Sequence, residues 1–255
     1  MTVHVATADG IATITIDRPD VRNAVDGPTA LALERAVDAA GKADEVQAIV
    51  LTGSAGTFCA GADLHAIARD PGRRNRLEAQ LRGPMGPTRM RAPVPVVAAI
   101  EGHAVAGGLE LALWADLRVM AADAVVGVFC RRWGVPLIDG GTVRLPRLIG
   151  MSRALDLVLT GRAVGADEAQ AMGLVNRVCP PGRAATVATE LAGEIIAFPA
   201  PAMLADRAGV HAAFDLDLDA ALLAEHERGM QAIRADGMAD VARFVEGAGR
   251  GGTFD

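Results

Sequence analysis

The chain has 255 residues, of which 51% are hydrophobic and 22% are charged, so it can bury the core of one large domain, or of one domain with a small appended region. Its formal net charge of -6 and its scattered basic residues, apart from Arg73, Arg74 and Arg76, argue against a nucleic-acid-binding surface. The three cysteines lack metal-ligand spacing, so no metal site is expected. No apolar run has the length of a membrane span, so no membrane contact is expected. The first residues lack a signal-peptide pattern, and a cytoplasmic protein is expected.

Strands and helices are predicted to alternate through the first half of the chain. Apolar and polar residues alternate at 11–16, which predicts a half-buried strand, and helical periodicity predicts a helix at 29–40. Buried β-branched runs and the glycines that follow them predict three further strands and one helix: strands at 48–52, 94–100 and 117–121, and a helix from Gly107. This order is typical of α/β proteins in which right-handed crossovers join parallel strands.

Helices are predicted to dominate the last third of the chain. Helical patterns occur at 143–148, 153–159, 166–172, 186–196 and 218–235. Pro180, Pro181 and Gly182 interrupt these patterns and mark the expected end of the core. The sequence shows no internal repeat and no low-complexity linker.

Residues 98–113, AAIEGHAVAGGLELAL, join a buried strand to a helix through a glycine turn. Gly107 and Gly108 allow a tight turn that leaves the N–H of Gly107 facing outward at a helix N-terminus, where it would stabilise an oxyanion. Glu110 follows among leucines, and burial there is expected to raise its pKa into a range useful for proton transfer. This arrangement predicts an enzyme acting on an activated acyl group. A second interpretation is that Glu110 only complements the helix dipole.

Four ordered motifs cover almost the whole chain: IDRPDVRNAV at 16–25, GTFCAGADL at 56–64, PVPVVAAIEGHAVAGGLELAL at 93–113 and LTGRAVGADEAQAMGLVNRV at 159–178. In these motifs the chain resembles the crotonase superfamily, the enoyl-CoA hydratase/isomerase family. The resemblance implies an α/β fold, a crotonase-like spiral of ββα repeats with a C-terminal helical region for trimer contacts. Residues 1–181 would form the spiral core with the CoA and active sites, and 182–255 the helical oligomerisation region. Structural repeats of this kind persist after their sequences have diverged.

The resemblance also assigns binding groups. The two oxyanion-hole amides would belong to Ala62, in CAGAD, and to Gly107, in VAGGLE. Two such donors stabilise the enolate that forms when a thioester loses a proton from its α-carbon, because the negative charge moves onto the carbonyl oxygen. The CoA adenine would lie beside the backbone of Ala60, Gly61, Ala62, Asp63 and Leu64, and Arg22 would approach the CoA phosphates. The other interpretation of Arg22 is an exposed charge on a turn.

Glu110 matches the first catalytic glutamate of the family, whereas the position of the second is occupied by Cys130, in VVGVFCRRW. A buried cysteine without a predictable histidine partner favours packing over a nucleophilic role. Asp139, in PLIDGGTVRLP, falls where some family members with other reactions carry a functional aspartate, so Glu110 and Asp139 are the predicted catalytic pair. The alternative for Asp139 is an N-cap for the helix expected to begin near Gly140.

The function that the resemblance implies is hydration of 2-enoyl-CoA by an enoyl-CoA hydratase in fatty-acid or related acyl-CoA metabolism. The missing second glutamate keeps two alternatives open: an enoyl-CoA or dienoyl-CoA double-bond isomerase, and a non-catalytic acyl-CoA-binding scaffold. Isomerisation can run on one proton-shuttling carboxylate, whereas hydration usually recruits two. Coenzyme A would arrive as part of the substrate, so no metal or redox cofactor is expected. The expected assembly is a homotrimer or a dimer of trimers.

Overall fold

A computed structural model describes residues 1–78, 82–237, 241–242 and 245–246 of the chain. The chain divides into two compact units, Met1–Gly193 and Glu194–Asp255. The first unit carries all the predicted site residues.

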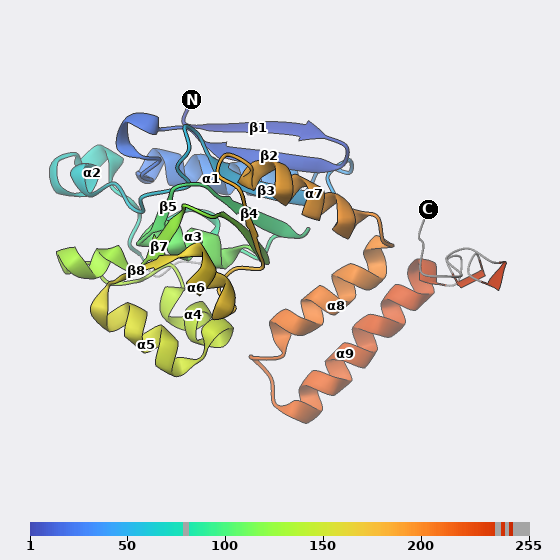
Figure 1. Ribbon diagram of the computed structural model, residues 1–255. Helices are drawn as coiled ribbons and strands as arrows, with labels where there is room; N and C mark the ends of the chain where they lie inside the picture. Colours follow the sequence, from blue (N-terminus) through green and yellow to red (C-terminus); the bar gives the residue numbers. More distant parts are fainter. Residues whose placement is uncertain (79–81, 238–240, 243–244, 247–255) are drawn as a thin grey trace. The chain divides into compact units, whose positions relative to one another are not determined.

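A six-stranded sheet with the order β1-β2-β3-β4-β6-β9 forms the centre of the first unit (Figure 1). Its strands are β1 (Val3–Ala8), β2 (Ile11–Ile16), β3 (Ala48–Gly53), β4 (Val96–Ile100), β6 (Leu117–Ala121) and β9 (Arg177–Cys179). Only β1 is antiparallel to its neighbour; the pairs from β2 to β9 are parallel. Every residue of β4 and all but the last of β3 are buried, as expected for parallel strands covered on both faces.

A second sheet has three short strands, and the first of them leads into the glycine turn at Gly107. Its order is β5-β7-β8, with β5 (His103–Val105) parallel to β7 (Val125–Gly127), and β7 antiparallel to β8 (Ala163–Gly165). The helix that follows β5, α3 (Gly107–Trp114), is buried from its second residue to its last. Because α3 is apolar on all sides except at Glu110, it is a core helix, and its one carboxylate is held inside the protein.

The other helices of the first unit are amphipathic or short. They are α1 (Gly27–Ala40), α2 (Leu64–Arg69), α4 (Gly141–Ile149), α5 (Met151–Thr160), α6 (Ala166–Ala171) and α7 (Ala184–Ile196), which runs past the end of the unit. The helix α1 begins at the N-cap Asp26, whose side chain accepts a hydrogen bond from the N–H of Thr29, and it buries Leu33 and Val37 in the core.

In the second unit, α8 (Ala200–Ala212) and α9 (Leu218–Ala232) pack against each other, and a π-helical turn, Ile233–Gly237, continues α9. Asp217 caps α9 by accepting from the N–H of Ala220. Several large apolar side chains of this unit are exposed, among them Val210, Phe214, Leu218, Leu222 and Leu223. Among the described residues no single helix is long and apolar enough to cross a membrane; α7 and α8 reach that length and composition only when counted together.

The predicted strands and helices agree with elements of the structure, and several further elements were not predicted. The strands predicted at 11–16 and 117–121 are found with those bounds, and the helix predicted from Gly107 begins there. The expected helix at 218–235 is α9 with its π-helical continuation. The prediction lacked β1, the three-residue strands, α2 and α8. Three residues are too few to show a period, and β1 buries only its first side chain.

Candidate active site

The turn between β5 and α3 leaves one backbone N–H without a partner. Ala106 precedes the helix with φ 54°, a left-handed conformation that is uncommon for alanine, and its N–H donates to the carbonyl of Gly127 at 2.9 Å. Gly107 is the first residue of α3. The first N–H groups of a helix have no acceptor within the helix. Within the described part of the chain, the N–H of Gly107 donates no hydrogen bond.

The N–H of Ala62, on another turn, is a second backbone donor without a partner within the described ranges. A parallel bridge joins Val25 to Ala62, and it uses the neighbouring groups: Val25 donates to the carbonyl of Gly61 at 2.8 Å, and Asp63 donates to the carbonyl of Val25 at 3.0 Å. In such a bridge the N–H of the central residue points away from its partner strand. Accordingly, no acceptor for the Ala62 N–H occurs among the described residues.

Gly61 shows how closely the two turns approach. It has φ 99°, which favours glycine, and a Cβ atom built on it would lie 3.0 Å from the nitrogen of Gly107. The predicted pair of amides, Ala62 and Gly107, therefore lies on two turns that are in close contact. Two unpaired N–H groups that are close together can bind an oxygen that gains negative charge.

Glu110 lies one turn into α3 and is held at the start of α4. Its side chain is 3% exposed, and Oε1 accepts hydrogen bonds from the backbone N–H of Asp139 at 2.8 Å and of Gly141 at 2.9 Å. Burial, reinforced by the charge of Asp139, raises the pKa of Glu110 to about 7, although both amides act in the opposite direction. No hydrogen bond to Oε2 occurs within the described residues, so this oxygen is available for a proton.

Asp139 is buried near Glu110 but is bonded to a different segment. Its Oδ1 accepts from the N–H of Met85 at 2.9 Å and from the hydroxyl of Thr88. Burial raises the pKa of Asp139, and these two hydrogen bonds oppose the shift. The alternative interpretation of Asp139 as a helix N-cap is wrong: the N-cap of α4 is Gly140, at φ 94°, and no side chain caps the helix there. The first amide of α4 is bonded to Glu110 instead.

Arg144 reinforces this arrangement from α4. Its guanidinium donates to the carbonyl of Asp139 at 2.9 Å and to the carbonyl of Thr88 at 2.6 Å. The backbone that holds Glu110 is therefore tied to the segment that holds Asp139. Sequence reasoning did not find Arg144, Met85 or Thr88, because no local pattern connects 85–88 with 139–144.

Cys130 is buried in the 3₁₀ turn Phe129–Trp133. Burial raises the pKa of its thiol, and the charge of Glu110 raises it further. Cys130 therefore lies within the electrostatic reach of Glu110 as a neutral thiol, and it supplies no second carboxylate.

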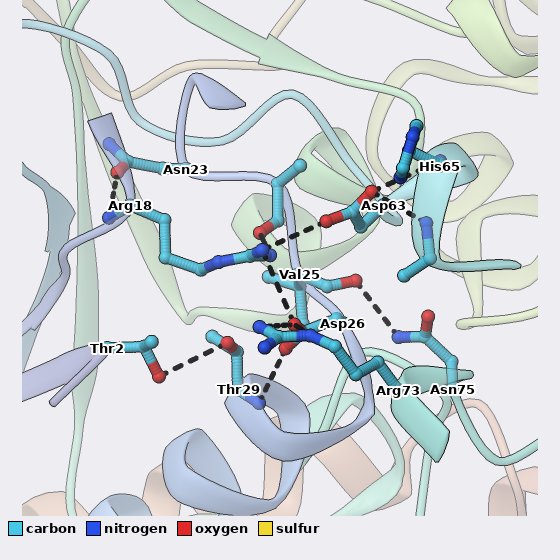
Figure 2. A network of polar contacts seen from close by, with 12 residues as sticks. Thr2, Arg18, Asn23, Val25, Asp26, Thr29, Asp63, His65, Arg73 and Asn75 are labelled. Atoms are coloured by element: carbon cyan, nitrogen blue, oxygen red, sulfur yellow. Dashed lines mark hydrogen bonds and ion pairs between the residues drawn. The ribbon is translucent and has the colours of Figure 1, made fainter. Parts of the chain in front are cut away.

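Most residues predicted to bind CoA lie in the Ala62 turn, at Ala60–Leu64, and Arg22 is bonded to that turn. Arg22 is exposed, with φ 52°, and its carbonyl accepts from the N–H of Ala60 at 3.0 Å. Leu64 is 41% exposed. Asp63, by contrast, is buried and committed to other contacts: Oδ1 caps α2, and Oδ2 pairs with Arg18 at 2.9 Å (Figure 2). The carboxylate of Asp63 is therefore occupied, and its backbone is the part left to meet a ligand.

Replacing Glu110 with glutamine is expected to stabilise the protein above neutral pH. The folded pKa of about 7 exceeds the ordinary 4.5, so the stability that Glu110 contributes is complete below about 4.5 and is lost as the pH rises through 7. Glu110→Gln should be more stable than the wild type by up to about 3 kcal/mol at pH 8, with the difference shrinking towards pH 5, in urea denaturation at both pH values. Glu101→Gln is the control, since Glu101 also accepts two amides near a helix start. A Glu110→Gln difference independent of pH would contradict the prediction.

The sheets and helices define the chain as an α/β protein. Its two unpaired amides and its buried carboxylate suit a substrate that develops charge on an oxygen. The chain belongs to the enoyl-CoA hydratase/isomerase family, whose sequence profile matches residues 6–247. No group of three or more His, Cys, Asp or Glu side chains suited to a metal ion occurs among the described residues.

Several known proteins are similar to this chain. Enoyl-CoA hydratase EchA19 of Mycobacterium tuberculosis is 37% identical over 72% of this chain and 70% of its own length. The short-chain-enoyl-CoA hydratase of Clostridium acetobutylicum is 32% identical over 85% of this chain and 84% of its own. The crystal structure of an enoyl-CoA hydratase from M. tuberculosis superimposes with a TM-score of 0.90 at 34% identity, covering 96% of each chain. The predicted α/β fold of the superfamily is thereby confirmed.

Proposed function

We propose that the protein is an enoyl-CoA hydratase, which adds water to the double bond of a 2-enoyl-CoA thioester. The observation that carries this proposal is the arrangement of three groups: the unpaired N–H groups of Ala62 and Gly107, on two turns in close contact, and the buried carboxyl group of Glu110 in the first turn of α3. Relatives named as hydratases support the same reaction.

In this mechanism, the thioester oxygen accepts hydrogen bonds from Ala62 and Gly107. Ionised Glu110 takes a proton from water through Oε2 while the water oxygen bonds to C3. The electron pair of the double bond moves onto the thioester oxygen as an enolate, which the two amides stabilise. The enolate then takes the proton from Glu110 at C2. One carboxylate therefore balances the reaction, and a pKa of about 7 lets it both accept and return the proton.

Asp139 is proposed as the second catalytic carboxylate. Burial favours its protonated form, and one of its oxygens already accepts from Met85 and Thr88, which leaves the other to face the substrate. The second candidate function is double-bond isomerisation, and the observation that favours it is the neutral thiol of Cys130 in place of a second glutamate.

The same proposal covers the CoA site, the fold of the core and the assembly of the protein. CoA would lie along the backbone of Ala60–Leu64 with Arg22 near its phosphates, and no metal or redox cofactor would take part. The strands would form the crotonase spiral in residues 1–181, and 182–255 would mediate a homotrimer or a dimer of trimers in the cytoplasm. The exposed apolar side chains of α8 and α9 support such an assembly, because large apolar patches on a surface mark contacts. Light scattering of the purified protein measures its mass.

The proposed reaction is tested by incubating purified protein with crotonyl-CoA and, separately, with its 3-enoyl isomer, in isotope-labelled water. Hydration predicts a 3-hydroxyacyl-CoA that carries the labelled oxygen, detected by mass spectrometry. Conversion of the 3-enoyl to the 2-enoyl thioester without hydration would favour the isomerase instead. Binding of both thioesters with turnover of neither would favour the non-catalytic scaffold.

A further inference from the structure

Arg18 lies in a polar network with Asp26 and Asp63 (Figure 2). Its side chain is 12% exposed, and its guanidinium makes three contacts. One amino group donates to the carboxylate of Asp63 at 2.9 Å and lies 3.3 Å from that of Asp26; the other donates to the carbonyl of Ala24. Arg18 thus joins two segments, 24–26 and 63, that are far apart in sequence.

Both segments border the backbone of Ala62. Asp63 directly follows Ala62, and its two carboxylate oxygens are fixed separately: Oδ1 by the first amides of α2, and Oδ2 by Arg18. Val25, between Ala24 and Asp26, forms the bridge to Ala62 through hydrogen bonds to Gly61 and Asp63. Arg18 therefore holds both segments of the bridge that orients the Ala62 N–H.

The network also holds the segment at 24–26 through further contacts. Asp26 caps α1 and pairs with both Arg18 and Arg73, while the side-chain amide of Asn75 donates to the carbonyl of Val25 at 3.1 Å. Arg73 is the more exposed of the two arginines and contacts Asp26 alone among these carboxylates. The two guanidinium groups share Asp26, but only Arg18 reaches across to the segment that carries Ala62.

We propose that Arg18 is a positioning residue for the Ala62 amide. The proposal rests on the proposed function, in which that amide stabilises the enolate. A donor of this kind acts only when it is held at hydrogen-bond distance from the place where the charge develops, and Gly61, at φ 99°, leaves the preceding backbone without side-chain restraint. The guanidinium fork of Arg18 supplies that restraint from Asp63 and Ala24 together, which the single ammonium group of a lysine does not reproduce.

The test compares Arg18→Lys and Arg18→Met with the matched control Arg73→Met, which removes the other arginine on Asp26. Two readouts are measured: kcat and KM for crotonyl-CoA, and the absorption band of a bound cinnamoyl-CoA carrying an electron-donating ring substituent. That band moves to longer wavelength when hydrogen bonds polarise the thioester carbonyl. Both Arg18 variants are expected to lower kcat by about ten- to a hundredfold with KM within about threefold, and to reduce the band shift of the bound probe. Arg73→Met should retain both readouts.

Asp63→Asn provides a second variant in case Arg18→Met does not fold. Asparagine keeps an acceptor that caps α2 and removes the charge that Arg18 binds, so the same losses are expected. Full kcat and a full band shift in Arg18→Lys and Asp63→Asn, with a wild type that shows both, would overturn the role of Arg18 alone. A wild type without turnover or band shift would overturn the proposed function, and the role of Arg18 with it.

Discussion

Glu110→Gln is expected to lower kcat for hydration of crotonyl-CoA by about a thousandfold, with little change in KM. Glutamine keeps an oxygen that can accept from the amides of Asp139 and Gly141, but it neither takes a proton from water nor returns one to C2. In the wild type, kcat/KM should rise with pH and level off above about 7, because the ionised form of Glu110 accepts the first proton. Steady-state rates across this pH range measure both effects.

Glu101→Gln is the matched control for this substitution. Glu101 also accepts two backbone N–H groups near the start of a helix, those of Gly182 and Ala184 at α7, and its carboxylate bonds to neither of the amides that hold Glu110. It should retain full activity. Retention of more than half of the wild-type kcat by Glu110→Gln would exclude Glu110 as the proton-transferring group.

Gly61→Ala is expected to reduce kcat by about a hundred- to a thousandfold, comparable with the loss of one oxyanion donor in other enzymes. The new methyl group would lie 3.0 Å from the nitrogen of Gly107 and 3.1 Å from the carbonyl oxygen of Val105, in the space between the two turns. It would therefore push the turns apart and cover an amide proposed to bind the thioester oxygen. Initial rates with crotonyl-CoA, together with thermal unfolding, measure the result.

Gly56→Ala separates this blocking effect from backbone strain. Gly56 also has a positive φ, 69°, in the same connection between β3 and α2, but a Cβ atom there would meet nothing within 4 Å. It should destabilise the protein modestly and leave kcat nearly unchanged. Equal losses of kcat in the two variants would assign the effect to strain and not to the site.

Site residues that are close together in sequence could be predicted, whereas contacts between residues far apart in sequence could not. Gly107 and Glu110 share one turn of one helix, so their spacing alone places them together, and the structure agrees. The contacts of Asp139 are different, because they come from Thr88 and Met85, more than fifty residues earlier and in a segment without periodicity. Arg18 lies within a motif identified in the sequence, but nothing local indicates that its partner is Asp63.

The same division holds for the fold. Strands such as β3 and β4 were predictable because continuous apolar runs match their burial on both faces. The second sheet was not, since β5, β7 and β8 have three residues each and are defined by their pairing. That sheet carries the turn into α3, so the predicted site depends on strands that the sequence does not reveal.

The two hydrogen bonds from the start of α4 to Glu110 create a thermodynamic linkage between a helix position and a proton. The amides of Asp139 and Gly141 bind the carboxylate more tightly when it is ionised, so lengthening these bonds raises the proton affinity of Glu110, and protonation in turn loosens the hold on α4. Arg144 fixes the same backbone from its other side. The segment from Asp139 to Arg144 therefore opposes the rise in pKa that burial causes at Glu110 and eases the release of its proton.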